Sequence, residues 1–249
     1  MVDYSDYENY IMKQVNSGDI CNFKSSDTYI FVLEHTSYDI GMKYLDIIRN
    51  SYNLSDNEIL TFCNINDRVG NPRLDSINGL LVSPSSLRYI FHSLKILDHC
   101  RSLGLNDITF VEIGAGYGGL ILALNHFASK YNIKIKEYHC VDLVWPLKLQ
   151  QKYISHHSLD FNVIPHVNYN FGSDIDGDNH FLISNYCFSE INRDYQNEYI
   201  KYLFPKINHG FIVWNHIQIY DIGKNIRVEL EYPLTCPEMH EHKNYYVYF

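Results

Sequence analysis

The segment Thr109–Leu120 holds four closely spaced glycines directly after a run of apolar residues. Gly114 permits a tight turn, and Gly116 lets the backbone approach a ligand because no Cβ stands in the way. Gly114, Gly116 and Gly119 have the GxGxxG spacing of a turn that joins a strand to a helix and carries a nucleotide cofactor. This spacing predicts a nucleotide-cofactor site but does not distinguish NAD from S-adenosylmethionine.

Two carboxylates favour S-adenosylmethionine over NAD. Glu112 ends the segment before the turn, where a carboxylate suits a cationic sulfonium amino acid and repels a pyrophosphate. Asp142 ends the next strand-like segment, 24 residues after Gly118, and this position suits an acceptor of both ribose hydroxyls. Asp142 also fits the N-cap of a helix. The other expected cofactor contacts are Ala115, Tyr117, Gly118, Leu143, Ser173, Asn185 and Tyr186.

Beyond residue 106, strand-like runs alternate with helical stretches. The five runs cover residues 108–113, 137–141, 161–167, 181–185 and 211–214. Such alternation is typical of parallel strands joined by right-handed crossovers. Residues 226–232 and 245–249 form two further runs with a short connection, which predicts an antiparallel hairpin at the sheet edge. The pattern predicts an α/β, Rossmann-like sheet of seven strands, five parallel and two in a C-terminal antiparallel hairpin.

The first 104 residues read as mostly helical. Apolar residues recur at helical spacing over Tyr38–Tyr52, Ser55 can cap a following helix, and Ser83-Pro84 starts another that ends near Gly104. No linker separates this region from the remainder. We therefore expect a helical region, residues 1–104, packed as a lid on a cofactor-binding domain, residues 105–249.

Two motifs resemble the sugar O-methyltransferase family, a branch of the class I S-adenosylmethionine-dependent methyltransferases. They are the Glu112–Leu120 segment and the Ser184–Ile191 segment after the fourth strand, with looser matches at 70–72 and 87–89. The resemblance covers roughly residues 65–249. It implies the class I methyltransferase fold, S-adenosylmethionine as cofactor, and methyl transfer to a hydroxyl of a nucleotide-linked sugar or a glycan.

Methyl transfer to a sugar hydroxyl calls for in-line geometry and a base that takes the hydroxyl proton. Glu190 and His216 are the candidate bases, because each follows a strand whose carboxyl end faces the ligand side of an open α/β sheet. Glu190 also fits a carboxylate in the first turn of a helix, and His216 fits a structural histidine. Arg68, Asn71 and Arg88 are candidates for binding substrate or the donor carboxylate.

The composition of the chain limits which kinds of molecule it is expected to bind. The net charge of −9, without a Lys/Arg cluster, opposes nucleic-acid binding. The six cysteines at 21, 63, 100, 140, 187 and 236 form no CxxC pair, and no signal-peptide or membrane-span pattern is visible, so we expect a cytoplasmic protein. The histidine clusters at 156–157 and 240–242 lack zinc-site spacing. Binding of a divalent metal by Glu190 is an alternative that the sequence leaves open, but no motif supports it.

Two other functions compete with this interpretation. An NAD-dependent sugar oxidoreductase or epimerase uses a similar glycine-rich turn, but near the chain start and with a Tyr-xxx-Lys pair, which Tyr195 and Tyr199 do not form. The second alternative is a catalytically inactive methyltransferase fold that serves as a binding module; the intact glycines, Glu112 and Asp142 argue against it, although they report on cofactor binding and not on turnover. Methylation of an amino group is disfavoured, because the Asn185–Phe188 segment is not an Asn/Asp-Pro-Pro-Tyr motif.

Overall fold

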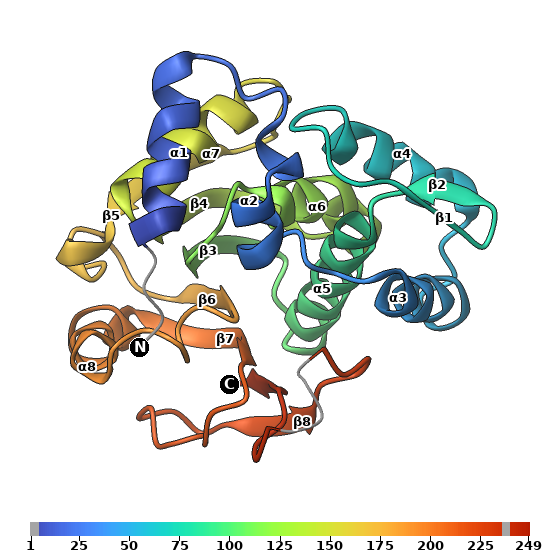
Figure 1. Cartoon of the computed structure of the whole chain (residues 1–249). Helices are drawn as coiled ribbons and strands as arrows, with labels where there is room; N and C mark the ends of the chain where they lie inside the picture. Colours follow the sequence, from blue (N-terminus) through green and yellow to red (C-terminus); the bar gives the residue numbers. More distant parts are fainter. Residues whose placement is uncertain (1–4, 236–239) are drawn as a thin grey trace.

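The computed structural model describes residues 5–235 and 240–249, and its centre is one seven-stranded sheet (Figure 1). The strand order is β5-β4-β3-β6-β7-β9-β8. The strands are β3 (Asp107–Ile113), β4 (Lys134–Asp142), β5 (Asn162–Val167), β6 (His180–Asn185), β7 (Ile207–Trp214), β8 (Arg227–Leu230) and β9 (Tyr245–Tyr248). The first five are parallel, and β9 pairs antiparallel with both β7 and β8. The predicted fold class is confirmed: this is the sheet of the class I methyltransferase fold.

Helices cover the two faces of the sheet unequally. The helices of the C-terminal part are α6 (Gly119–Phe127), α7 (Val144–Ile154) and α8 (Arg193–Tyr202). On one face, α6 and α7 share a hydrophobic core with α5 (Pro84–Ser102), around Phe110 and Tyr138 of the sheet. On the other face, α8 packs through Tyr199 and Leu203 in a smaller core. The glycine-rich turn lies between these two cores, at the carboxyl end of β3.

The N-terminal region packs on the more heavily covered face. It comprises α1 (Ser5–Ser17), α2 (Asp27–Val32), α3 (Tyr38–Ser51) and α4 (Asp56–Asp67). Ser55 caps α4 with a reciprocal capping box to Glu58, as its position predicted. Helix α1 lies against α7, where Lys152 Nζ donates to Val15 O at 2.8 Å. The hydrophobic core of this face is continuous from these helices to β3 and β4.

A short hairpin interrupts the helices of the N-terminal region. Strands β1 (Asp75–Ile77) and β2 (Leu80–Val82) pair antiparallel around the two-residue turn Asn78-Gly79. Both turn residues have positive φ, 44° and 87°, as a tight hairpin turn of this kind requires. The sequence predicted a mostly helical region here, although the Asn-Gly dipeptide is a usual signal of such a hairpin turn.

Candidate cofactor and acceptor site

The glycine-rich turn has a backbone that only glycine tolerates at its first position. Gly114 has φ +77°, and a Cβ there would lie 2.3 Å from Cys187 Sγ. Its N–H donates to Val141 O of the neighbouring strand at 3.0 Å. Gly116 and Gly118 also have positive φ, 57° and 99°. The turn therefore lies against both β4 and the segment after β6, and residues 115–118 are buried while Gly114 is half-buried.

Gln150 joins the turn to Asp142, the predicted ribose-binding carboxylate. Its side-chain amide donates to Gly116 O at 2.8 Å and to Asp142 Oδ2 at 3.0 Å. The other carboxylate oxygen, Asp142 Oδ1, accepts from Leu143 N at 2.8 Å. Burial raises the pKa of Asp142 to about 7, although these hydrogen bonds oppose the shift. The carboxylate is thus held at a set place beside the turn, and it titrates near neutral pH.

Glu112 lies below the turn, away from solvent. Only 2% of the residue is exposed, and Tyr138 Oη donates to Glu112 Oε2 at 2.7 Å from the neighbouring strand. Burial raises the pKa of Glu112 to about 8. At neutral pH this side chain is therefore largely protonated, so any electrostatic attraction to a cationic ligand requires that it lose its proton.

The side chain of Tyr117 points away from the sheet edge and into the N-terminal region. Its hydroxyl accepts from Asn66 Nδ2 at 3.1 Å, and the ammonium of Lys24 lies 4.1 Å from its ring centroid. Tyr117, Lys24 and Asn66 are each 1% exposed or less. A cofactor on the turn can consequently meet the backbone of Tyr117 but not its ring.

Two side chains of the N-terminal region cover the turn. A Cβ on Gly116 would lie 3.3 Å from Leu33, the residue that ends α2. Tyr7 of α1 is 7% exposed, and burial followed by the charge of Asp142 raises its pKa. Helices α1 and α2 therefore lie over the place where the ribose and the turn would meet a ligand.

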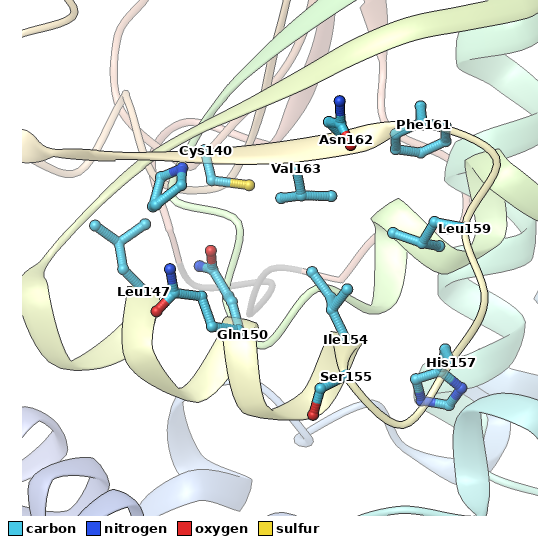
Figure 2. Close-up of a pocket in the computed structure, with 12 residues that line it drawn as sticks. Cys140, Leu147, Gln150, Ile154, Ser155, His157, Leu159, Phe161, Asn162 and Val163 are labelled. Carbon is cyan, nitrogen blue, oxygen red and sulfur yellow. The ribbon is translucent and has the colours of Figure 1, made fainter.

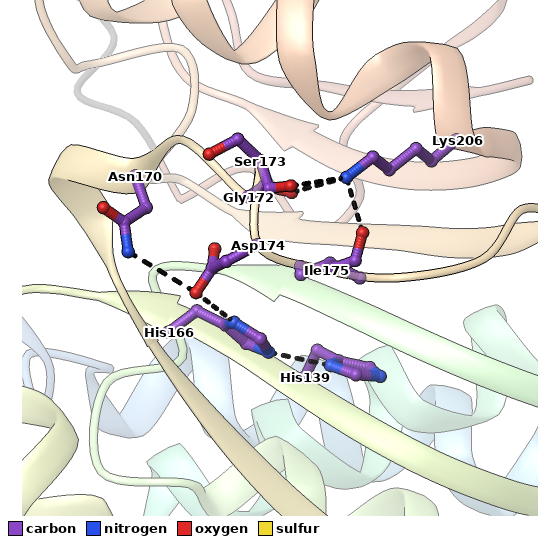
Figure 3. A network of polar contacts seen from close by, with 8 residues as sticks. All are labelled: His139, His166, Asn170, Gly172, Ser173, Asp174, Ile175 and Lys206. Carbon is purple, nitrogen blue, oxygen red and sulfur yellow. Dashed lines mark hydrogen bonds and ion pairs between the residues drawn. The ribbon is translucent and has the colours of Figure 1, made fainter.

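A polar network holds the loop that carries Ser173 (Figure 3). Asp174 Oδ2 contacts His166 Nδ1 at 2.8 Å, and His166 Nε2 contacts His139 Nδ1 at 2.8 Å. Lys206 Nζ donates to Ser173 O at 3.0 Å on the other side of the loop. Ser173, predicted to contact the adenine, is exposed at the carboxyl side of β5, while the Asp174 carboxylate binds within the loop.

Asn185 and Tyr186 end β6 beside the turn and point toward α5. The side-chain amide of Asn185 lies 3.4 Å from His92 Nδ1, and the Tyr186 hydroxyl donates to Glu231 Oε1. Tyr186 has φ +59°, which is rare for a residue with a Cβ and turns the chain back toward the glycine-rich turn. The next residue, Cys187, is the one that contacts Gly114.

The two predicted bases are connected through Asn215. Asn215 Nδ2 donates to Glu190 Oε1, and Asn215 Oδ1 contacts His216 Nδ1 at 2.8 Å. The His216 ring stacks on His240 with centroids 3.6 Å apart, and burial followed by the charge of His240 lowers its pKa. The structure thus brings together residues that follow β6 and β7, 26 positions apart in the sequence.

The predicted substrate residues on the N-terminal side are dispersed. Arg68 donates to His156 O, which lies just beyond the C-terminal end of α7. Asp142 lies just before the N-terminal end of the same 11-residue helix. Arg68 is therefore roughly 16 Å from the ligand edge, the length of the helix. Asn71 binds Asn22. Arg88 is 6% exposed and donates to Leu33 O at 2.6 Å, so it supports α2 over the turn.

Two pockets stand out in the described part of the chain. One, of about 330 Å³, lies between α7 and β5 and is lined by Ile154, His157 and Val163 (Figure 2). Its lining also includes Gln150, which contacts Gly116 and Asp142, so the pocket extends from beside the turn to His157 and the start of β5. The other, of about 740 Å³, is lined by Glu190 and residues that follow β6 and β7, and so opens on the ligand edge.

The cysteines and acidic groups show no metal centre within the described residues. Cys21, Cys63, Cys100, Cys140 and Cys187 are free, and Cys236 lies outside the described residues. No group of three His, Cys, Asp or Glu side chains there is arranged to hold a metal ion. Among the helices within 5–235 and 240–249, none combines the length and the apolar character needed to cross a bilayer.

The sequence matches no protein-family model and no curated protein. Solved structures resemble it distantly. A proposed S-adenosyl-L-methionine-dependent methyltransferase from Methanococcus maripaludis is 16% identical, with a TM-score of 0.39 over 51% of this chain and 55% of that chain. A proposed RNA methyltransferase from Pyrococcus horikoshii is 13% identical, with a TM-score of 0.41 over 64% and 80%.

A third solved structure aligns along the whole length. MtNAS, in complex with MTA and tNA, is 15% identical with a TM-score of 0.41 over 100% of this chain and 98% of that chain. By contrast, this chain spans only 55% of the length of the Methanococcus protein. Identities and scores this low do not identify an activity or a substrate, and the fold assignment follows from the strand order and directions of the sheet itself.

Sequence reasoning missed Gln150 and Cys187, the two side chains that contact the turn most closely. Gln150 is 2% exposed on the side of α7 that also buries Leu147, Leu149 and Tyr153. A polar residue on an otherwise apolar helix face was the available signal, since a buried amide needs partners. No sequence signal pairs Cys187 with Gly114, because their contact depends on β3 and β6 being neighbours.

Proposed function

We propose that this chain binds S-adenosylmethionine at the glycine-rich turn and transfers its methyl group to a hydroxyl of a sugar, either nucleotide-linked or part of a glycan. The observation that best supports cofactor binding is the contact made by Gln150, whose side-chain amide donates to both Gly116 O and the Asp142 carboxylate. This bridge holds the turn and the predicted ribose acceptor in one arrangement. A turn kept only for packing would need no carboxylate beside it.

The residues present fit this cofactor. Gly114 and Gly116 leave the backbone of the turn without a Cβ, and Asp142 offers acceptor oxygens beside it. Bound S-adenosylmethionine supplies an electrophilic methyl group on a sulfonium sulfur. Asp142 accepts from the ribose hydroxyls, and Leu33 and Tyr7 exclude water from above. No role for a metal follows from the residues at the turn.

Glu190 takes the proton that the sugar hydroxyl loses on transfer. Asn215 donates to Glu190 and contacts His216, so we assign Asn215 and His216 as positioning residues that orient the carboxylate. The sugar as acceptor rests on the resemblance of the Ser184–Ile191 segment to sugar O-methyltransferases. Weak nucleophiles such as sugar hydroxyls gain from a carboxylate placed in this way.

Calorimetry with S-adenosylmethionine, S-adenosylhomocysteine and NAD tests the cofactor. We expect both adenosyl ligands to bind, and Asp142→Ala to weaken them by about tenfold or more, since charge-assisted hydrogen bonds are lost. Asp46→Ala is the matched control, because Asp46 is exposed on α3. Binding of NAD without either adenosyl ligand would replace this proposal with the oxidoreductase alternative.

Turnover separates an enzyme from an inactive binding fold. Incubation with S-adenosylmethionine and a panel of nucleotide sugars and oligosaccharides should yield S-adenosylhomocysteine and a methylated sugar. Glu190→Gln should keep cofactor affinity and lower the rate about 100-fold or more, the usual contribution of a positioned base. Cofactor binding with no product from the panel would favour the inactive alternative.

A further inference from the structure

The pocket of about 740 Å³ lies where an acceptor would reach the turn. Its volume is within the range of small-molecule sites. Its walls are the segment Ser189–Gln196, which follows β6, and the segment Ile217–Tyr220, which follows β7. The carboxyl ends of these parallel strands share one edge with the glycine-rich turn. The pocket is therefore open toward the same edge at which the cofactor is proposed to bind.

Cys187 connects this pocket to the turn. Burial, then the charges of Asp142 and Glu190, raises the pKa of the Cys187 thiol, so both carboxylates lie within electrostatic reach of it. Cys187 itself contacts Gly114. Glu190 lines the pocket. Glu190 N also donates to Cys187 O at 2.9 Å, so the segment that carries the Glu190 carboxylate is joined directly to the residue that lies against the turn.

The lining of the pocket combines polar side chains and one aromatic ring with three isoleucines, Ile191, Ile217 and Ile219. Beside Glu190, the polar lining side chains are Ser189, Asn192, Arg193, Gln196, Gln218 and Tyr220. Amide and hydroxyl groups of this kind bind sugar hydroxyls by hydrogen bonds. The Gln196 side chain is 3% exposed, donates to Phe188 O at 2.8 Å and accepts from Tyr220 Oη at 2.5 Å. This wall is therefore rigid before any ligand arrives.

Arg193 differs from every other arginine of the chain in its partners. Four of the others pair with carboxylates: Arg49, Arg73, Arg101 and Arg227. The remaining two, Arg68 and Arg88, donate to backbone carbonyls. Among residues 5–235 and 240–249, no carboxylate lies within 4.0 Å of Arg193. Arg68 and Arg88 also lack a carboxylate partner, but their guanidinium groups donate to backbone carbonyls, whereas Arg193 donates to no backbone carbonyl of the described residues.

The Arg193 guanidinium is nonetheless held in place. It lies 3.2 Å from the centroid of the Tyr220 ring, and its Nη1 donates to Gln196 Oε1 at 3.4 Å. Stacking on an aromatic face leaves the outer edge of a guanidinium available for two parallel hydrogen bonds to a phosphate or carboxylate. Arg101 and Arg227 also lie over tyrosine rings, but each of them is paired with a carboxylate, whereas no carboxylate of the described residues pairs with Arg193.

We propose that this pocket is the acceptor site and that Arg193 binds an anionic group of the acceptor, a phosphate or a carboxylate, while the hydroxyl to be methylated lies at Glu190. The inference rests on the proposed function for the methyl donor and adds the chemical class of the acceptor. Acceptors of this class are sugar phosphates, nucleotide-linked sugars and uronates. Neutral sugars lack the group that Arg193 recognises.

Calorimetry on the full chain saturated with S-adenosylhomocysteine tests the pocket. The probes are glucose 6-phosphate, UDP-glucose, glucuronate and, as the neutral reference, glucose. We expect at least one anionic probe to bind about tenfold or more tightly than glucose, and its affinity to fall as salt rises from 20 to 200 mM. The three anionic probes distinguish a phosphomonoester, a diphosphate and a carboxylate as the recognised group.

Substitutions locate the binding at Arg193. Arg193→Gln should weaken the anionic probe about tenfold and leave glucose unchanged, and Arg193→Lys should recover part of the loss, because charge returns without the bidentate edge. Arg101→Gln is the matched control, an exposed arginine on the last turn of α5. Equal binding of the anionic probe to wild type and Arg193→Gln would overturn the proposal.

The outcomes separate this inference from the proposed function. If S-adenosylhomocysteine binds and no anionic probe binds, the acceptor proposal fails and the cofactor proposal stands. If S-adenosylhomocysteine does not bind, the probes are titrated into the free chain. Binding that depends on Arg193 would then still support an anion site in the pocket, and a lack of such binding would overturn it. In that second case the methyl-transfer function fails by its own test.

Discussion

The glycine-rich turn meets two unlike regions, one on each face of the sheet. On the side of α5, Lys24, Asn66, Tyr117 and Tyr153 form a buried anchor with almost no exposed atoms. Lys24 Nζ donates to Asn66 O at 2.7 Å, and Tyr153 Oη donates to Asn66 Oδ1 at 2.8 Å. On the side of α8, the pocket with Arg193 is open and is lined by polar side chains together with three isoleucines.

This difference indicates that the buried anchor has a structural role and that the pocket has a ligand-binding role. Burial lowers the pKa of Lys24 to about 8, which shows that its ammonium is kept in the anchor against a desolvation cost. A group retained at such a cost, with every partner inside the protein, stabilises the turn and does not bind ligand. The pocket has the opposite character, since Arg193 keeps donors that no carboxylate of the described chain occupies.

The largest expected effect concerns the turn that both regions share. Gly114→Ala combines a positive φ with overlap against Cys187, so we expect a loss of about 3 kcal/mol in the free energy of unfolding. Gly104→Ala is the matched control, because Gly104 also has positive φ, +71°, but nothing lies within 4 Å of its would-be Cβ. It should lose about 1 kcal/mol in urea unfolding. Equal losses would show that Cys187 gives way and does not constrain the turn.

The next effect compares the anchor with the pocket by the same substitution. Asn66→Ala removes the buried amide that contacts the Tyr117 hydroxyl and Ser86 Oγ and leaves the Tyr153 hydroxyl only the backbone oxygen of residue 66, so we expect a loss of about 2 to 3 kcal/mol. Asn192→Ala removes an N-cap of α8 at the pocket, where Asn192 Oδ1 accepts from Asp194 N at 2.8 Å, and should cost about 1 kcal/mol. Urea unfolding of both variants measures the difference, and a larger loss for Asn192→Ala would reverse our assignment of roles.

The smallest expected effect is the pH dependence of cofactor affinity. The pKa of Asp142 is about 7, so its carboxylate is ionised above pH 7 and protonated below. Ribose hydroxyls donate to the ionised form, and we expect S-adenosylhomocysteine to bind about tenfold more weakly at pH 6 than at pH 8. Calorimetry across this range measures the dissociation constant.

Two variants assign this pH dependence. Asp142→Asn should bind weakly at every pH, with a flat profile. Glu112, whose pKa is about 8, also titrates near the turn, and Glu112→Gln should retain the transition near pH 7. Loss of that transition in Glu112→Gln would assign the pH dependence to Glu112 in place of Asp142.

The sequence predicted the fold to within a few residues at most strand ends. All seven strands and the antiparallel hairpin at the sheet edge were foreseen, because apolar runs of strand length and the helices between them are local features of the chain. The β1–β2 hairpin was missed, since its strands are only three residues long. The contact of Cys187, just after β6, with Gly114 was not predicted, because it depends on β3 and β6 being neighbours in the sheet.

The sequence by itself determined which residues form strands, where the turn lies and that an acid follows the second strand, because each depends on residues close together in the chain. Only the tertiary structure decided that Tyr117 faces the anchor, that Arg68 lies at the far end of α7, and that Arg193 meets Tyr220. Those contacts join segments far apart in sequence or on opposite faces of the sheet. Packing and strand order set them, and local spacing does not encode either.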